Sequence, residues 1–212
     1  ASAQNKTAII ADGERVSYRE LSDRIAQYAG TLAAAGLAPE QRMLLFGTDS
    51  LDYVTAWLGA VRLGAVPVVV SDLYKAKDLL YFLTDTAVRL LFIDSEQVPK
   101  FLEVADDLPS SLKTVVVRGE TVEVARRCPR QSVIALPAAL AASTATAAYR
   151  RHPDDVTYMF YSGGTTGTAK GITHLAHDFL IVPARHGALW EYSAGDVVFA
   201  TSKKYFTHGV WP

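Results

Sequence analysis

The chain has 212 residues, of which half are hydrophobic and a fifth are charged. This length accommodates one large domain or somewhat more, and the composition is that of a folded globular protein rather than a disordered one. The 21 Lys and Arg residues nearly balance the 22 Asp and Glu residues, for a net charge of −1. A balanced charge argues against general electrostatic binding of nucleic acid or of an anionic membrane, but it leaves room for a local anion site.

Cysteine content and hydropathy further limit the class of protein to which the chain can belong. Cys128 is the sole cysteine, so neither an intrachain disulfide nor a multi-cysteine metal cluster can form. The longest uncharged apolar run, Leu63–Val70, is far shorter than the roughly 18 residues of a membrane span. The first residues also lack the apolar core of a signal peptide. These features predict a cytoplasmic protein that does not enter the membrane, with an oligomeric state that the sequence leaves open.

The chain begins with a hairpin and a capped helix. Thr7–Ile10 and Arg15–Ser17 flank an Asp-Gly pair, a combination typical of a tight hairpin turn. Ser17 and Glu20 form a capping-box pattern, in which the hydroxyl and the carboxylate accept hydrogen bonds from free amides at the start of a helix. We expect this helix to end at Gly36, because glycine readily takes the left-handed conformation that stops a helix.

Strands and helices alternate from this point to residue 117. The expected strands are apolar runs, at Arg42–Phe46, Val66–Val70, Arg89–Asp94 and Thr114–Val117. The expected helices between them run from Leu51 to Val61 and over Lys75–Thr84, the first with apolar residues at intervals of three and four. Strands that are apolar on both faces belong to a parallel sheet covered by helices. The sequence therefore predicts an α/β fold with a helix-covered, largely parallel sheet.

The pattern weakens over 120–153 and then returns. Within this connection, Ala138–Ala148 is expected to form a short helix followed by a surface loop. A strand at Val156–Tyr161, a helix at Ala176–Trp190 and a strand at Val197–Ala200 complete the expected elements.

The segment Tyr161–Gly171 (YSGGTTGTAKG) has the composition of an anion-binding loop. It follows a predicted strand and holds four glycines, four Ser or Thr hydroxyls and Lys170. Glycines let the backbone approach a ligand closely, successive free amides form an anion-binding nest, and hydroxyls and the lysine add donors and charge. This set suits phosphate oxygens. The segment is not the usual phosphate loop, because Ala169 stands where that pattern needs glycine before the lysine.

This segment resembles the signature of the adenylate-forming superfamily of acyl-CoA synthetases, luciferases and peptide-synthetase adenylation domains. That signature has two hydroxyl residues followed by Gly, a hydroxyl residue, Thr, Gly, any residue, Pro, Lys and Gly. The chain departs from it at Gly163, where a hydroxyl residue is usual, and at Ala169, where proline is usual. The resemblance implies that the following residues bind the phosphates of ATP: Ser162, Gly163, Gly164, Thr165, Thr166, Gly167 and Lys170.

The resemblance extends along almost the whole chain. Val16–Leu21 and Gly59–Val70 are similar to the first two core motifs of the superfamily. Lys203–Gly209 falls where the superfamily has an aromatic-rich segment that lines the acyl and AMP pockets. The sequence of this segment is most similar to that of benzoate and other aryl-CoA ligases. The resemblance implies that four residues border these pockets: Lys203, Tyr205, Phe206 and His208.

The resemblance also implies a reaction in two steps. A small carboxylic acid, here an aryl acid, attacks the α-phosphate of Mg-ATP and gives an acyl-adenylate and pyrophosphate. The thiol of coenzyme A then displaces AMP. ATP, Mg²⁺, coenzyme A and the carboxylic acid are therefore the expected reactants and cofactors.

The resemblance suggests how the chain is divided. Residues 1–150 correspond to a first subdomain of the superfamily's large N-terminal domain, and 151–212 to the phosphate loop and the start of a second subdomain. The superfamily's later motifs, which supply a Mg²⁺-binding glutamate, a ribose-binding aspartate and a small C-terminal domain with a catalytic lysine, have no counterpart in this sequence. We expect the chain to be the N-terminal portion of a larger ligase, with no certain catalytic residue and no metal ligand, and to be unable to complete adenylation alone.

Two other functions remain open. One is an adenylation domain of a peptide-synthetase-like system that loads a carrier protein, and the other is a non-catalytic nucleotide- or phosphate-binding module. Simpler structural interpretations are preferred for several polar residues. His174 and His177 flank the start of a predicted helix and fit capping or solvation better than metal ligation, while Cys128 and Asp154–Asp155 are expected to have no catalytic part.

Overall fold

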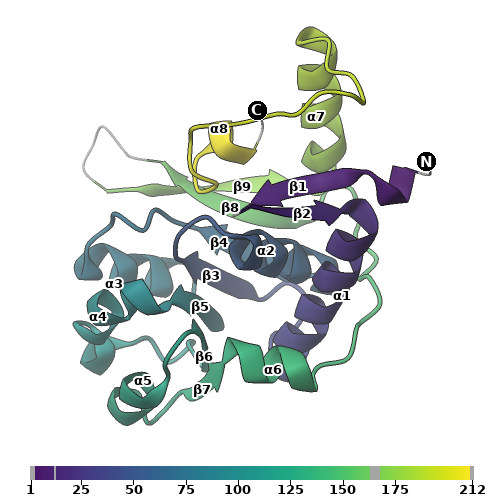
Figure 1. The fold of residues 1–212 in the computed structure, drawn as a ribbon. Helices are drawn as coiled ribbons and strands as arrows, with labels where there is room; N and C mark the ends of the chain where they lie inside the picture. The colour runs from purple at the N-terminus through teal and green to yellow at the C-terminus, as the bar shows by residue number, and fades with distance from the viewer. Residues whose placement is uncertain (1–2, 12, 163–167, 211–212) are drawn as a thin grey trace.

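The computed structural model describes residues 3–11, 13–162 and 168–210, without the side chains of residues 207 and 208. Its centre is a seven-stranded sheet, in which six strands are parallel and one edge strand is antiparallel (Figure 1). Across the sheet the strands follow the order β7 (Ser132–Ala135), β6 (Thr114–Arg118), β5 (Leu90–Asp94), β3 (Arg42–Phe46), β4 (Val66–Val69), β8 (Val156–Ser162) and β9 (Lys170–Leu175). The predicted α/β class with a largely parallel sheet is confirmed.

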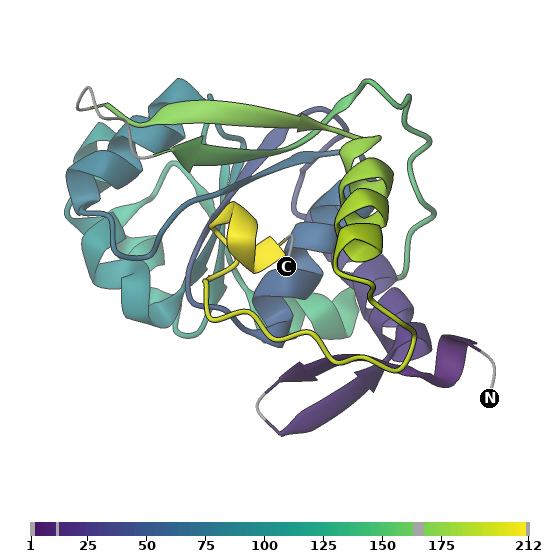
Figure 2. The same ribbon diagram turned by 90° about the horizontal axis from the view of Figure 1, so that it is seen from above.

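Helices cover both faces of this sheet (Figure 2). One face carries α1 (Tyr18–Ala34), α2 (Leu51–Leu63) and α6 (Leu136–Ala142), and the other carries α3 (Ala76–Asp85), α4 (Val98–Leu102) and α5 (Val122–Arg127). Within β3, Met43 and Leu45 pack against the first set, while Leu44 and Phe46 pack against the second. This alternation explains why the strand is apolar from Met43 to Phe46.

Further short elements surround this core. α7 (Asp178–Leu189) and α8 (Thr207–Val210) lie at the top in Figure 1, beyond β8 and β9. Short 3-10 helices occur at Ala3–Asn5, Ser95–Gln97 and Ala105–Asp107. Of the helices in the described part of the chain, none combines the length and apolar character needed to cross a membrane.

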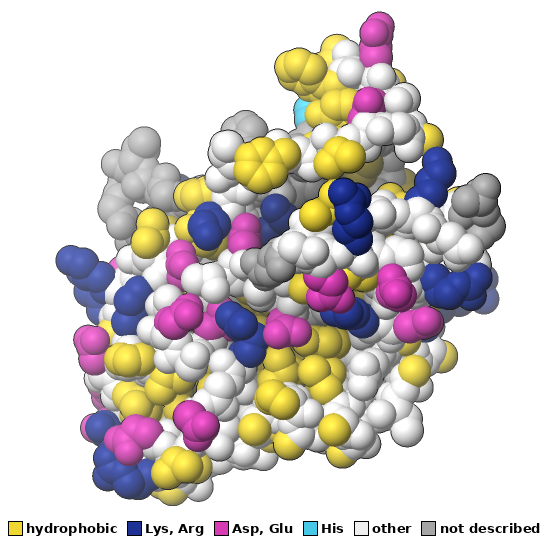
Figure 3. All heavy atoms as spheres, in the orientation of Figure 1, with side chains coloured by type: hydrophobic (Ala, Val, Ile, Leu, Met, Phe, Trp, Pro, Cys, Tyr) yellow, Lys and Arg dark blue, Asp and Glu magenta, His cyan; other side chains and the backbone are white. Residues whose placement is uncertain are grey.

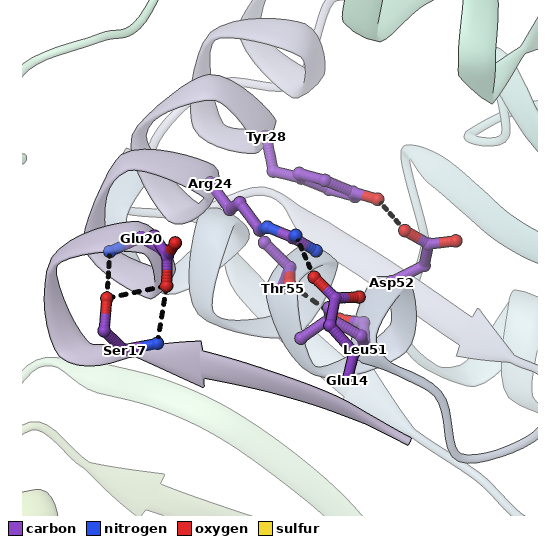
Figure 4. A network of polar contacts seen from close by, with 8 residues as sticks. All are labelled: Glu14, Ser17, Glu20, Arg24, Tyr28, Leu51, Asp52 and Thr55. Atoms are coloured by element: carbon purple, nitrogen blue, oxygen red, sulfur yellow. Dashed lines mark hydrogen bonds and ion pairs between the residues drawn. The ribbon is translucent and has the colours of Figure 1, made fainter. Parts of the chain in front are cut away.

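The N-terminal hairpin and the capping box form as predicted. β1 (Thr7–Ala11) pairs with β2 (Glu14–Ser17) in an antiparallel ribbon separate from the main sheet. The Ser17 hydroxyl accepts the backbone N–H of Glu20 at 3.2 Å, and the Glu20 carboxylate accepts the backbone N–H of Ser17 at 2.8 Å (Figure 4). These two bonds satisfy amides that the first turn of α1 would otherwise leave free.

Two side-chain contacts fasten α1 to its neighbours (Figure 4). Arg24 of α1 donates to Glu14 of β2 and so ties the hairpin to the helix. The Tyr28 hydroxyl donates to the carboxylate of Asp52, in the first turn of α2. Burial, reinforced by this hydrogen bond, raises the pKa of Tyr28, so the hydroxyl stays protonated and remains a donor.

The sequence patterns missed two edge strands and predicted one strand that does not form. β7 and β9 were not expected, because each has partly or largely exposed residues and lacks the continuous apolar run of the central strands. Val197–Ala200 is irregular, and within the described chain it pairs with no strand. Val197 and Phe199 are 77% and 85% exposed. A strand-like composition is not sufficient without a neighbouring strand to complete the hydrogen-bonded ladder.

The connection over 143–155 is an ordered crossover along α1 and α2. Its path leaves no space for a side chain at Gly30, where a Cβ atom would lie 1.8 Å from the carbonyl oxygen of Thr144. The Arg62 guanidinium of α2 donates to the carbonyl of Thr146 at 3.0 Å. The crossover carries the chain from β7, at one edge of the sheet, to β8 on the far side of β4.

The strand order has a switch point between β3 and β5, where ligands often bind in open α/β sheets. Here that position is filled by an ion pair, in which the carboxylate is fully buried and the guanidinium is partly exposed. The Asp94 carboxylate, at the end of β5, is fully buried and accepts two bonds from Arg118 at 2.8 and 2.9 Å. It also accepts the backbone N–H of Thr48 at 2.8 Å, and a Cβ atom on Gly47 would meet it at 2.5 Å. This packing leaves the ends of β3, β5 and β6 tied together.

We expect Asp94→Ala to lower the free energy of unfolding by about 3 kcal/mol, because it leaves Arg118 and the Thr48 amide without their shared acceptor. Urea unfolding followed by circular dichroism measures the change. Glu123→Ala breaks a pair with Arg126 that lies in solvent, and it should leave the transition unchanged. An Asp94→Ala protein as stable as the wild type would show that the buried pair does not hold these strand ends together.

Candidate functional site

β8 and β9 form the stem of the glycine-rich segment. Ser162 is the last residue of β8 and Lys170 is the first of β9, and the antiparallel register places them opposite each other. The Ser162 hydroxyl lies 3.5 Å from the carbonyl oxygen of Lys170, and the Lys170 residue itself is exposed. Five predicted phosphate-binding residues lie outside the described residues: Gly163, Gly164, Thr165, Thr166 and Gly167. The structure thus shows where the loop leaves and rejoins the sheet.

Helix α3 supports both sides of this stem. The Tyr81 hydroxyl donates to the carbonyl of Ala169 at 3.0 Å, just before β9 begins. The Tyr161 hydroxyl, near the end of β8, donates to the carboxylate of Asp85. The Phe82 ring lies 4.4 Å from that of Tyr161, measured between centroids. Burial raises the pKa of Tyr161 and the Asp85 bond adds to this effect, so the tyrosine remains a donor.

The aromatic segment near the end of the chain folds as a compact turn. Tyr205 is 6% exposed and belongs to the core between the sheet and α2, whereas Phe206 is 53% exposed. Their ring centroids are 4.8 Å apart, and the backbone N–H of Phe206 donates to the carbonyl of Lys203 at 3.0 Å. The backbone of His208 lies in α8, while its side chain is outside the described part of the structure.

Parallel strand direction brings the loop stem and the aromatic segment to the same edge of the sheet, where the carboxyl ends of its strands lie. Because β3, β4 and β8 are parallel neighbours, their carboxyl ends lie side by side. Ser162 ends β8, Ser71–Asp72 follows β4, and Asp49 follows β3. The Asp49 carboxylate accepts the backbone N–H of Lys204, at 3.1 Å from each oxygen. Burial raises the pKa of the Tyr205 hydroxyl, and the nearby Asp72 carboxylate adds to this effect.

His174, His177 and Cys128 have structural contacts away from this edge. His177 is the residue before α7, and His174 Nδ1 lies 3.0 Å from Asp178 Oδ2 in the first turn of that helix. Cys128 is buried at the end of α5, and burial raises the pKa of its thiol. Within the described residues, His, Cys, Asp and Glu side chains form no group of three or more that could hold a metal ion.

Four residues at the candidate site were not identified from the sequence: Asp49, Asp72, Tyr81 and Asp85. One pattern could have found the first two. Small polar or acidic residues directly follow the apolar strands β3 and β4, and Asp94 ends β5 in the same way. In a parallel sheet such residues share one edge, so they could have been grouped. Tyr81 and Asp85 lie four residues apart on α3, and nothing in their spacing points to the loop 76 or more residues away.

The AMP-binding enzyme family matches residues 1–212. The chain belongs to this family. In sequence, the chain is 34% identical over 202 residues to a 3-hydroxybenzoate–CoA/4-hydroxybenzoate–CoA ligase of Thauera aromatica. The matched region covers 95% of the chain and 37% of the relative. It is also 32% identical over 209 residues to a 4-hydroxybenzoate–CoA/benzoate–CoA ligase of Rhodopseudomonas palustris. Here the matched region covers 97% of the chain and 36% of the relative.

In structure, this AMP-binding chain resembles an anthranilate CoA ligase, AuaEII, crystallised with anthranoyl-AMP. The TM-score is 0.86 at 28% identity, over 99% of the chain and 39% of that protein. The chain therefore spans little more than a third of the length of the relatives it matches. The resemblance inferred from the loop and from the aromatic segment is confirmed at the level of the family.

We expect Gly209→Ala to destabilise the turn that carries Tyr205 and Phe206. A Cβ atom there would lie 2.1 Å from the carbonyl oxygen of Lys203 and 2.7 Å from that of Ser202, and these backbone atoms cannot move away cheaply. Overpacking of this kind costs about 1–3 kcal/mol in unfolding free energy. Chemical denaturation of the purified chain measures it.

Gly187→Ala is the matched control for that substitution. Gly187 lies inside α7, and a Cβ atom there would meet only Tyr192, at 3.9 Å. Alanine is the better helix former, so this variant should be neutral or more stable by up to about 1 kcal/mol. Equal effects of the two substitutions would contradict the close packing at Gly209.

Proposed function

We propose that the 212 residues are the N-terminal part of an AMP-forming ligase, which activates an aryl carboxylic acid as its acyl-adenylate and transfers it to coenzyme A. One observation carries this proposal. The stem of a loop rich in glycine, hydroxyl residues and lysine ends at the same sheet edge as a partly exposed aromatic segment. That arrangement suits a reaction in which a phosphate and an aromatic acid must meet.

In this proposal the loop binds the phosphates of ATP. Its backbone amides and hydroxyls donate to phosphate oxygens and Lys170 adds a point charge, so that a carboxylate can approach the α-phosphate without strong repulsion. The phosphate-binding residues proposed are Ser162, Gly163, Gly164, Thr165, Thr166, Gly167 and Lys170. Opposed strand ends and the support from α3 would hold the two sides of the loop in fixed positions.

The aromatic segment would border the acyl and AMP pockets. Tyr205 is fixed in the core, whereas Phe206 presents about half of its surface and is free to contact an aromatic ring. Lys203 and His208 are proposed to complete this border. The relatives named above act on benzoate or hydroxybenzoate, and these names support an aryl acid as the substrate class.

Mg²⁺ is proposed to enter bound to ATP. Because it commonly binds through substrate phosphates and one or two carboxylates, a preformed protein cage is not required. The division of the chain near residue 150 stays a prediction, and so does a cytoplasmic location.

An exposed apolar surface supports the proposal that these residues work within a larger protein. Hydrophobic side chains gather over α7 and over the segment that leads to α8 (Figure 3). They are Leu180, Ile181, Leu189, Trp190, Tyr192, Val197, Val198 and Phe199. An apolar surface of this kind commonly marks an interface with further polypeptide. We therefore expect the 212 residues alone to lack adenylation activity.

Exchange of labelled pyrophosphate into ATP tests the proposed first step. In the longer protein that contains this chain, exchange should depend on an aromatic acid such as benzoate, a hydroxybenzoate or anthranilate. Lys170→Ala should lower the rate about 100-fold, because a charge aimed at the phosphates is lost. Lys113→Ala removes the same charge from an exposed residue just before β6. This residue lies where the strands begin, away from their carboxyl ends, so the variant should leave the rate unchanged.

Two results would refute this proposal. One is an absence of exchange with every aromatic acid in the longer protein. The other is an equal loss of rate in Lys170→Ala and Lys113→Ala, which would mean that the loop lysine has no special role.

A further inference from the structure

We propose that Asp49 is a positioning residue for the acyl pocket. Its carboxylate anchors the main chain of the aromatic segment 203–206 to the carboxyl edge of the sheet, and so sets where Tyr205 and Phe206 stand. The inference rests on the proposed function of that segment. Asp49 lies 155 positions before Lys204 in sequence, and in this proposal it supports the pocket without lining it.

The location of Asp49 leaves its carboxylate available for this task. Asp49 lies between β3 and α2, directly before Ser50. Ser50 is the residue that caps α2, because its hydroxyl accepts the backbone N–H of Tyr53 at 3.1 Å. Asp49 instead turns both carboxylate oxygens to the backbone N–H of Lys204, each at 3.1 Å. Hydrogen bonds to an ionised acceptor are about twice as strong as neutral ones.

The anchor acts on the main chain of Lys204 and not mainly on its side chain. The ammonium nitrogen of Lys204 lies 3.9 Å from Asp49 Oδ2, at the limit of an ion pair. Both side chains are partly exposed to solvent, where such pairs contribute little. The bond to the backbone amide does not depend on which side chain stands at position 204.

Fixing the Lys204 amide fixes the pocket residues that follow. Tyr205 is the next residue, and it packs into the core beside α2. The Phe206 amide donates back to the Lys203 carbonyl, which closes the turn around Lys204. Release of the Lys204 amide would therefore let the exposed ring of Phe206 shift relative to the sheet edge.

A second role for Asp49 must be separated from the anchor. Negative charge near a helix N-terminus stabilises the helix, and Asp49 lies close to the start of α2. Asp52 lies in the first turn of the same helix and bonds to the Tyr28 hydroxyl. Asp52→Asn removes a charge from the same helix end and leaves an oxygen for that hydroxyl, so it is the matched control. Asp49→Asn keeps one acceptor oxygen and should retain part of the anchor.

Amide hydrogen exchange of Lys204, followed by NMR in the 212-residue chain, tests the anchor directly. The wild-type amide should be protected, and Asp49→Ala should speed its exchange at least about tenfold. Asp49→Asn should be intermediate, whereas Lys204→Ala and Asp52→Asn should keep the protection at position 204. The amide of Leu44, buried in β3, reports whether each variant is folded. An unprotected wild-type amide, or one unaffected by Asp49→Ala in a folded chain, would overturn the anchor.

Pyrophosphate exchange in the longer enzyme tests the role in the pocket. Asp49→Ala should raise KM for the aromatic acid about tenfold and leave KM for ATP within about twofold, since the displaced Phe206 ring contacts the acid whereas the loop between β8 and β9 holds the phosphates of ATP. Asp49→Asn should recover part of the loss, and Asp52→Asn should match the wild type. Equal increases in both KM values would overturn the role. If no aromatic acid supports exchange, the proposed function and this role both fail, while the Lys204 amide still decides whether the anchor exists.

Discussion

The parallel pairing of β8 with β4 is the constraint on which the candidate site depends. Val68 lies opposite Met159 and Val69 opposite Phe160, so β8 ends at the same edge as β4. β8 reaches this position because the crossover is held along α1 and α2. The Arg151 guanidinium donates to the carbonyl of Ala65 at 2.6 Å, just ahead of β4. A different placement of β8 would separate the loop stem from the aromatic segment.

The filled switch point explains why the candidate site lies beside β4 and β8. In an open α/β sheet, a ligand is expected where the strand order reverses, which here is between β3 and β5. Asp94 and Arg118 occupy that position, with Gly47 too close to accept any side chain. The addition of β8 and β9 extends the sheet on the other side of β4. The glycine-rich loop is thereby placed two strands away from the usual crevice.

Much of this fold could be predicted because its central strands face helices on both sides. A continuous apolar run such as that from Met43 to Phe46 follows directly from that burial, and the Ser17–Glu20 capping box is a local interaction. Edge strands such as β7 lack this double burial, and Val197–Ala200 has strand composition without a partner strand. The contact between Asp49 and Lys204 is long-range, so it depends on how the strand ends meet and has no local pattern.

ATP and an aromatic acid are proposed to bind at one edge of this sheet, through the loop and the aromatic segment. Hydrogen exchange measured by mass spectrometry on the longer protein tests it most directly, with a non-hydrolysable ATP analogue and benzoate added separately. The analogue should slow exchange in peptides covering 161–171, and benzoate should slow it in peptides covering 203–210. Protection confined to other surfaces, such as the pocket lined by Asp106 and Arg130, or no protection at all, would contradict the account.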